Sequence, residues 1–235
     1  MPRLALLSTS DKTGLIDLAK SLVTEFDYEI ISSGGTAKTL KDAGISVTKV
    51  SDYTGFPEIL GGRVKTLHPR IHGGILARKD LPQDVEELNA NNIRPIDLVV
   101  VNLYPFEKTI SQPEVTLAEA IEKIDIGGPA MLRASAKNFA HLTVLCNPSQ
   151  YNSYLEELRK NTGEVSLEFR QKCALTGFQH TATYDQAIAT YLQEQQTTFE
   201  SEKSEKETFF LSGKKIKTLR YGENPHQSAT WYQRG

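Results

Sequence analysis

The feature that most restricts the fold is a regular alternation of short apolar runs with helix-type periodicity over residues 1–150. Apolar residues at i, i+3 and i+4 spacing predict a helix from Leu15 to Phe26, and Ala37–Ala43 predicts a shorter helix ended by Gly44. The apolar runs predict strands at Arg3–Leu7, Tyr28–Ile31, Val47–Val50, Asp97–Leu103 and Thr143–Cys146. This alternation predicts an α/β fold with a mostly parallel sheet flanked by helices, and the three consecutive valines of Asp97–Leu103 fit a strand buried on both faces.

Composition excludes several classes of function. The 27 Lys+Arg against 29 Asp+Glu leave a net charge of −2, which gives no general attraction to nucleic acid. The two cysteines, Cys146 and Cys173, fit free thiols of a cytoplasmic protein rather than a disulfide framework. The apolar opening Leu4–Leu7 is too short for a signal peptide, and no apolar stretch approaches the ~20 residues of a membrane span. Secreted, membrane and nucleic-acid-binding proteins are therefore disfavoured.

The chain divides into three parts. Residues 1–196 predict one domain, in which the Gly- and Pro-rich stretch 51–78 is expected to be a long functional loop and residues 150–196 to be helical. Residues 197–208 are almost wholly polar and indicate a linker. Residues 209–235 are too few for a core of their own, so they are expected to be the start of a second domain.

Two predicted strand-to-helix junctions have the composition of phosphate-binding loops. Ser33, Gly34, Gly35 and Thr36 combine small residues and hydroxyls with a helix N-terminus, whose free N–H groups attract anions. The alternative is a tight turn with Thr36 as the helix cap. The second junction, residues 8–13, adds Ser8, Ser10 and Lys12. In a parallel sheet both junctions would meet at the carboxyl ends of the strands, where ligands bind.

The glycine-rich segment 61–69 carries the cations Arg63 and Lys65 beside Thr66. An arginine can bind phosphate in a fork and a lysine acts as a point charge, although a solvated basic loop is the alternative. His68 and His72 have the i, i+4 spacing of a metal-binding pair, but Pro69 lies between them and no Glu follows His68, so no metal site is expected.

Acid–base candidates follow later in the chain. Asn102 and Tyr104 follow the valine-rich strand, and Asp125 precedes a helical run that ends near Lys137. Asp125 could simply cap that helix, and Lys137 could be a surface charge on its last turn. Together with Lys65, however, these residues form the kind of acid–base set that proton-transfer chemistry on a small phosphorylated molecule requires.

Eight ordered segments together resemble the N-terminal part of the family of bifunctional purine biosynthesis enzymes that combine AICAR transformylase and IMP cyclohydrolase. The resemblance covers nearly the whole chain apart from the linker. The matching segments are STSDKTG (8–14), SGGT (33–36), TGFPE (54–58), GGRVKTLHP (61–69), NLYPF (102–106), IDIGG (124–128), RASAKN (133–138) and RYGENPHQ (220–227).

The resemblance implies a methylglyoxal-synthase-like fold for residues 1–195 and closure of the inosinate ring without metal or redox cofactor. By this likeness, Lys65, Tyr104, Asp125 and Lys137 would carry the chemistry, with Asp125 at the carboxamide nitrogen and Lys137 or Lys65 at the formyl oxygen. The residues implied in binding the ribotide are Ser8, Ser10, Lys12, Ser33, Gly35, Thr36, Arg63, Thr66, Asn102 and Gly127.

The likeness extends into the second domain of the family. That domain transfers a formyl group from 10-formyltetrahydrofolate, and Arg220 and Tyr221 match positions that contact its substrate. The family's catalytic Lys–His pair would follow beyond the last residue, so neither formyl transfer nor folate binding is expected of this polypeptide alone. The resemblance also implies a homodimer for the full-length protein, made largely through that second domain.

Three other interpretations differ in what they require. A phosphate-ligand-binding regulatory module of the same fold would need the phosphate loops but not Asp125, Lys137 and Tyr104 together. A methylglyoxal-synthase-type lyase would bind a much smaller substrate and would leave the segment 220–227 unexplained. A purely structural protein fits least, because many polar residues follow the predicted strands.

Overall fold

The computed structural model describes residues 2–197, 213–220, 222–224 and 226–234. The strands are β1 (Arg3–Thr9), β2 (Tyr28–Ser32), β3 (Thr48–Lys49), β4 (Leu98–Asn102), β5 (Thr143–Leu145), β6 (Gly213–Leu219) and β7 (Ala229–Arg234). The helices are α1 (Leu15–Phe26), α2 (Gly34–Asp42), α3 (Val50–Thr54), α4 (Pro69–Leu76), α5 (Pro82–Ala90), α6 (Phe106–Ile110), α7 (Leu117–Glu122), α8 (Gly127–Lys137), α9 (Tyr151–Lys160) and α10 (Leu167–Thr197), with 3₁₀ turns η1 (Leu60–Gly62) and η2 (Pro148–Gln150).

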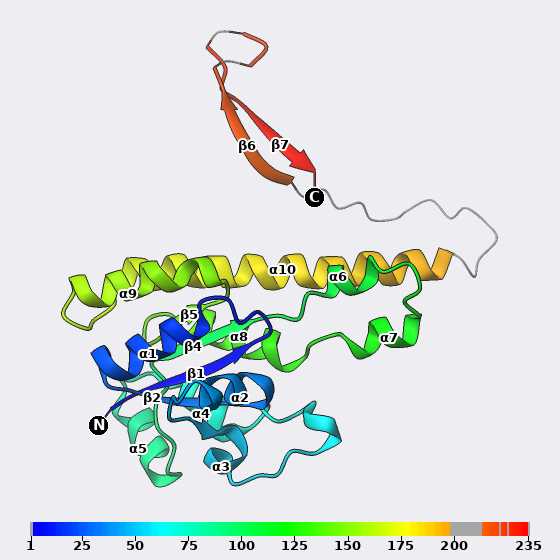
Figure 1. Cartoon of the computed structure of the whole chain (residues 1–235). Helices are drawn as coiled ribbons and strands as arrows, with labels where there is room; N and C mark the ends of the chain where they lie inside the picture. The colour runs from blue at the N-terminus through cyan, green and yellow to red at the C-terminus, as the bar shows by residue number, and fades with distance from the viewer. Residues whose placement is uncertain (1, 198–212, 221, 225, 235) are drawn as a thin grey trace. The chain divides into compact units, whose positions relative to one another are not determined.

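Five parallel strands form the central sheet in the order β3-β2-β1-β4-β5. The pairing of β1 with β4 sets Leu7 opposite Val100 and Thr9 opposite Asn102. Figure 1 shows helices on both sides of the sheet. The predicted α/β fold with a parallel sheet flanked by helices is confirmed.

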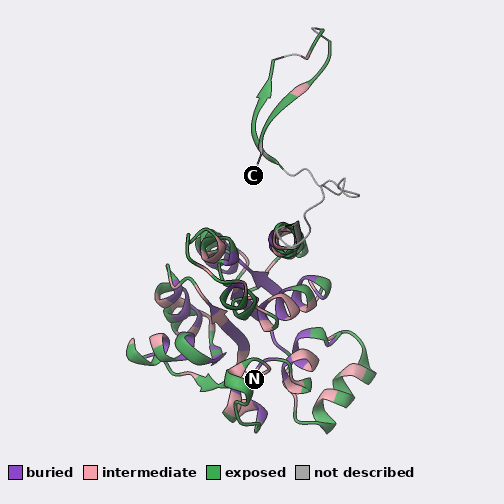
Figure 2. Cartoon of the chain, turned by 90° about the vertical axis from the view of Figure 1, so that its right-hand side faces the viewer, coloured by how far each residue is buried: buried purple, intermediate pink, exposed green. Residues whose placement is uncertain are grey.

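The sheet is buried on both faces, because successive strand residues contribute to two separate cores. Val99 and Val101 of β4 pack with α4, α8 and α10, whereas Leu98 and Val100 pack with α1, α2 and α9. All four side chains are at most 1% exposed. Figure 2 shows the strands buried between helices whose outer faces are exposed. Full burial of each such aliphatic side chain stabilises the fold by about 1.5–3 kcal/mol relative to its exposure.

Two element boundaries differ from the prediction. The expected strand Val47–Val50 is reduced to Thr48–Lys49, and Val50 instead begins α3, where it is 1% exposed. The helix expected from Ala37 begins three residues earlier, at Gly34. In both cases a tertiary contact sets the limit: Val50 is drawn into the core between β2 and α4, and the N-terminus of α2 is fixed against the end of β1.

The stretch 51–78 is not the long loop that its glycines and prolines predicted. It contains α3, η1 and α4, and Pro69 begins α4 at its first turn, where a proline costs no hydrogen bond. Gly74 lies inside α4 because a Cβ there would come within 2.6 Å of the Arg94 carbonyl oxygen. The glycine thus serves the close packing of a helix and does not mark a loop.

The C-terminal part is helical up to residue 197, as expected for α9 and α10. The contacts divide the chain into two units, Met1–Glu194 and Gln195–Gly235. Apart from the last residues of α10, the described part of the second unit is the antiparallel hairpin β6–β7 with its connecting turn. Most of the expected linker, and the residues 209–212 expected to open the second domain, lie outside the described residues. Within the described chain, no helix combines the length and the apolarity needed to cross a membrane.

Both cysteines are free and buried, and burial raises the pKa of Cys146 to about 11 and that of Cys173 to about 12. Because the thiolate is the reactive form, both should stay inert at about pH 8. We expect Ellman's reagent to titrate neither thiol in the folded chain and both in guanidinium chloride. Rapid release of one equivalent from folded protein would contradict this placement.

Candidate functional site

The site begins where β1 and β4, adjacent in the sheet, both end. The carboxamide oxygen of Asn102 accepts hydrogen bonds from the Ser10 backbone N–H (2.5 Å), the Ser10 hydroxyl (2.9 Å) and the Asp11 backbone N–H (2.9 Å). The strand order reverses between β1 and β4, which is the position where open parallel sheets bind their ligands. Ser10, which follows β1, and Asn102, which ends β4, therefore lie in contact at this edge of the sheet.

The N-terminus of α2 lies against the same end of β1. The Thr36 hydroxyl accepts the Thr9 N–H, donates to the Thr9 carbonyl (both 3.0 Å) and accepts from Lys12 Nζ at 2.9 Å. All hydrogen-bonding positions of this hydroxyl are occupied within the protein, so the side chain of Thr36 positions the helix. Its backbone N–H is the group that could contact a ligand. Ser33 precedes the helix without capping it through its side chain, and the space in front of Gly35 is open. The first N–H groups of α2 therefore have no side-chain cap, which is the arrangement found at helix termini that bind anions.

A cation faces this helix terminus. A Cβ at Gly34, which has a φ of +53°, would lie 3.2 Å from Lys65 Nζ. Within the described residues, Lys65 has no carboxylate partner within ion-pair distance. A positive side chain beside the positive end of a helix dipole is unfavourable unless an anion lies between them. The arrangement thus favours a bound anion such as phosphate.

Lys12 contributes a second cation near the same terminus. Its ammonium contacts the Thr9 carbonyl as well as Thr36, and its burial lowers the pKa of the amine, with Asp11 opposing the shift. A partly desolvated ammonium gains most from an anionic ligand that replaces lost water.

The segment after Lys65 leads directly to the acid–base candidates. A Cβ at Gly127 would lie 2.7 Å from the Thr66 hydroxyl, so only glycine permits this approach. Asp125 Oδ1 accepts the Gly128 N–H at 2.9 Å and thereby caps α8, which is the alternative role considered above. A Cβ at Gly128 would also lie 2.9 Å from a methyl group of Leu103, the residue after β4.

These contacts form a closed circuit around one edge of the sheet. It runs from the end of β1 to α2, to the loop of Lys65 and Thr66, to the start of α8, and back through Leu103 to Ser10, whose hydroxyl donates to the Leu103 carbonyl at 2.8 Å. Five segments distant in sequence thus place two cations, a helix terminus and a carboxylate together. Such a site can bind a phosphorylated molecule and position a proton acceptor beside it.

Two predicted residues lie at the rim. Tyr104 is 47% exposed, with the ammonium of Lys123 at 5.3 Å from the centre of its ring. Arg63 is exposed and forms an ion pair with Glu122 at the end of α7. The sequence analysis did not predict Lys123 as a residue near Tyr104. Its position two residues before Asp125 is the sequence feature that could have indicated it.

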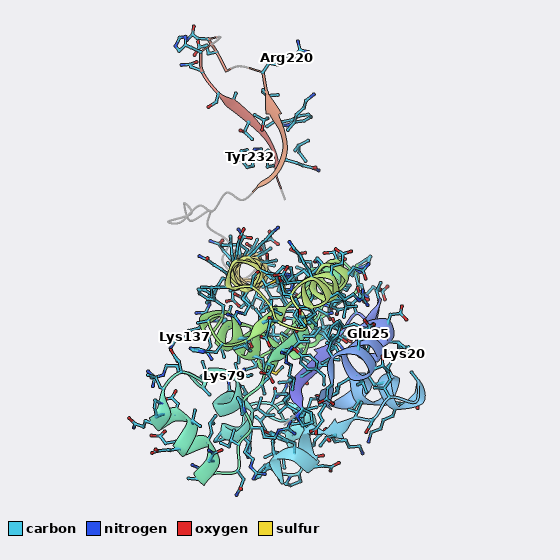
Figure 3. The ribbon with its side chains drawn as sticks, turned by 90° about the vertical axis from the view of Figure 1, so that its left-hand side faces the viewer. Lys20, Glu25, Lys79, Lys137, Arg220 and Tyr232 are labelled. Atoms are coloured by element: carbon cyan, nitrogen blue, oxygen red, sulfur yellow. The ribbon has the colours of Figure 1, made fainter. Side chains whose placement is uncertain are left out.

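Lys137 is not brought to this site, and the expectation that it surrounds the reacting groups is corrected here. It is the last residue of α8, which rises about 15 Å from Gly127 to that end. The next residue, Asn138, donates to the carbonyls of Ile75 and Ala77 near the end of α4. Lys79 pairs with Asp97, directly before β4, and Figure 3 shows Lys137 on the same side of the domain as Lys79. A helix that starts at the site necessarily ends away from it.

The remaining predicted residues are placed as follows. Ser8 lies half-buried in β1 opposite Val101. Arg220 is exposed after β6 in the second unit, Tyr221 lies outside the described residues, and their expected role stays a prediction. His68 caps α4 and His72 lies within it, and no cluster of three potential metal ligands occurs among the described residues.

A cavity of about 500 Å³ lies at the opposite edge, where β1 begins and α1 and α9 end. Its two arginines are already neutralised: Arg159 pairs with Glu25, and Arg3 with Glu164 and the Gly163 carbonyl. Because these guanidinium groups have partners within the protein, the candidate site remains the carboxyl edge of the sheet.

Comparison with known proteins agrees with this fold. A family model described as "MGS-like domain" matches residues 14–130, and one described as "AICARFT/IMPCHase bienzyme" matches residues 135–235. The "Bifunctional purine biosynthesis protein PurH" of Trichodesmium erythraeum is 95% identical over this whole chain, which covers 46% of that relative. The protein of the same name from Nostoc punctiforme is 71% identical, with 45% covered. The solved structure "Crystal structure of ForH" has a TM-score of 0.73 and 38% identity, covering 80% of this chain and 98% of that one.

The fold and the site define an α/β domain of the MGS-like class. The chain spans less than half the length of the PurH relatives named above. It belongs to the family of the bifunctional purine biosynthesis protein PurH, the AICARFT/IMPCHase bienzymes.

We expect inorganic phosphate to bind at α2, and Lys65→Ala to weaken its affinity about tenfold, as loss of a charge-assisted hydrogen bond would. Phosphate titrations followed by melting temperature and calorimetry measure this affinity. Lys20→Ala is the matched control, since Lys20 is exposed on α1 (Figure 3). Equal phosphate affinity in the two variants would rule out the assignment.

Proposed function

We propose that this chain is an IMP cyclohydrolase of purine biosynthesis, which closes the ring of 5-formamidoimidazole-4-carboxamide ribotide to give IMP. The observation that carries the proposal is the position of Lys65 at the uncapped N-terminus of α2, in one circuit with Asp125. Membership of the bienzyme family supports the same activity. A cytoplasmic setting is part of the proposal and is supported by the two free thiols.

The ribotide phosphate would bind at the N-terminus of α2. Backbone N–H groups of residues 34–36, the ammonium of Lys65 and that of Lys12 supply its hydrogen bonds and charge. The ribose would follow toward Ser10 and Asn102, and the imidazole toward Thr66 and Gly127. In this orientation, the carboxamide and formamide groups would lie between Asp125 and Tyr104.

Ring closure forms one bond and releases one water. The carboxamide nitrogen attacks the formyl carbon, and one proton from that nitrogen and one from the formamide nitrogen leave with the formyl oxygen as water. Asp125 would orient the carboxamide and accept its proton, because only one carboxylate oxygen is needed to cap Gly128. Of the two lysines expected at the formyl oxygen, Lys65 lies at this edge of the sheet, and Tyr104 would donate a hydrogen bond there.

The 235-residue chain should convert the formylated ribotide to IMP, measured by absorbance, and Asp125→Asn should lower kcat about a hundredfold, the contribution of a general base. The asparagine amide oxygen can still accept the Gly128 N–H, so this substitution removes the charge and keeps the helix cap.

Asp42→Asn makes the same change of charge at an exposed position at the end of α2 and should retain wild-type turnover. Wild-type turnover in Asp125→Asn would refute the role of Asp125. Phosphate-dependent stabilisation without turnover in a folded wild type would indicate a ligand-binding module instead.

A further inference from the structure

A tyrosine of α10 holds the backbone of Asp125. The Asp125 backbone N–H donates a hydrogen bond to the Tyr184 hydroxyl oxygen at 2.8 Å. Tyr184 is 59 residues further along the chain and only 8% exposed. Burial raises the pKa of its phenol, which therefore stays neutral near pH 8 and is suited to holding a hydrogen bond rather than accepting a proton.

The same ring also contacts the segment that carries Tyr104. Tyr184 meets Phe106 edge-on, with ring centres 6.3 Å apart, and Phe106 is 1% exposed. The Phe106 N–H in turn donates to the Tyr104 carbonyl at 2.8 Å. One side chain thus contacts both segments that would flank the reacting groups.

α10 provides a firm base for this contact, because it lies directly against α8. A Cβ at Gly177 of α10 would come within 3.0 Å of a Leu132 methyl group of α8. α8 begins two residues after Asp125, so Tyr184 and Asp125 are held in one packed unit. A shift of Tyr184 relative to the Asp125 loop would have to disturb this packing.

We propose that Tyr184 is a positioning residue for the cyclohydrolase reaction, which sets the place of the Asp125 carboxylate relative to Tyr104 through its hydroxyl group. This inference rests on the proposed function. Tyr184 touches no reacting atom; its hydroxyl removes one degree of freedom from the loop before α8. Misplacement of a reacting group by about 1 Å can cost about a hundredfold in rate, so a loosened Asp125 should lower kcat more than substrate affinity.

The test is Tyr184→Phe in the 235-residue chain, which removes one oxygen atom and keeps the ring on Phe106. Tyr191→Phe is the matched control: Tyr191 lies on the same helix, is also 8% exposed and packs edge-on against Phe106 at 5.7 Å. Kcat, KM, IMP affinity and melting temperature are measured for both variants and the wild type, well below the lowest melting temperature.

We expect Tyr184→Phe to lower kcat about tenfold or more with KM and IMP affinity changed less than about twofold, and Tyr191→Phe to match the wild type. Equal kcat in the two variants would overturn the inference. So would a loss in Tyr184→Phe that falls on IMP affinity as much as on kcat, since this indicates a collapsed site. A folded wild type without turnover would instead overturn the proposed function itself.

Discussion

The pairing of β1 with β4 is the contact on which the rest of the site depends. These strands are separated by 88 residues between Thr9 and Leu98, yet their parallel register sets Thr9 opposite Asn102. The connections after β1 and β4 start side by side and lead to helices on opposite faces of the sheet. The other site segments lie around this junction. The Asn102 carboxamide closes this junction by accepting two backbone N–H groups that the turn after β1 would otherwise leave unpaired.

The site combines positively charged side chains with polar groups that also make structural hydrogen bonds. Thr36 and Asp125 each make the hydrogen bonds of an ordinary structural residue, while Lys65 faces a helix terminus without a carboxylate partner among the described residues. The structural bonds fix the positions of these groups, and the positive charge at the end of α2 favours an anionic ligand there. A bound phosphate would remove the repulsion between Lys65 and the N-terminus of α2. The free energy of phosphate binding would then help to hold the rest of a ligand at Asp125.

α10 connects the two halves of this arrangement. It packs on α8 through Gly177, contacts the segment after β4 through Phe106, and reaches the Asp125 backbone through Tyr184. The helix belongs to the region matched by the bienzyme model, whereas the N-terminus of α2, Lys65 and Asp125 lie in the region matched by the MGS-like model. The hydrogen bond between Tyr184 and Asp125 therefore joins the two matched regions within one packed domain.

Local sequence determined the strands, the main helices and the residue types at the strand ends, because burial on both faces and helix-end chemistry leave periodic and compositional signals in short segments. Tertiary structure alone decided the rest. From sequence, Gly73 and Gly74 indicate a loop, but the structure places them in α4, where Gly74 packs closely against the Arg94 carbonyl. Lys137 is predicted as a site residue, but it lies at the end of α8, about 15 Å along the helix from Gly127. Tyr184 carries no local signal, since its partner is 59 residues distant. Contacts between segments far apart in the chain depend on how the elements pack, and no short stretch of sequence records that packing.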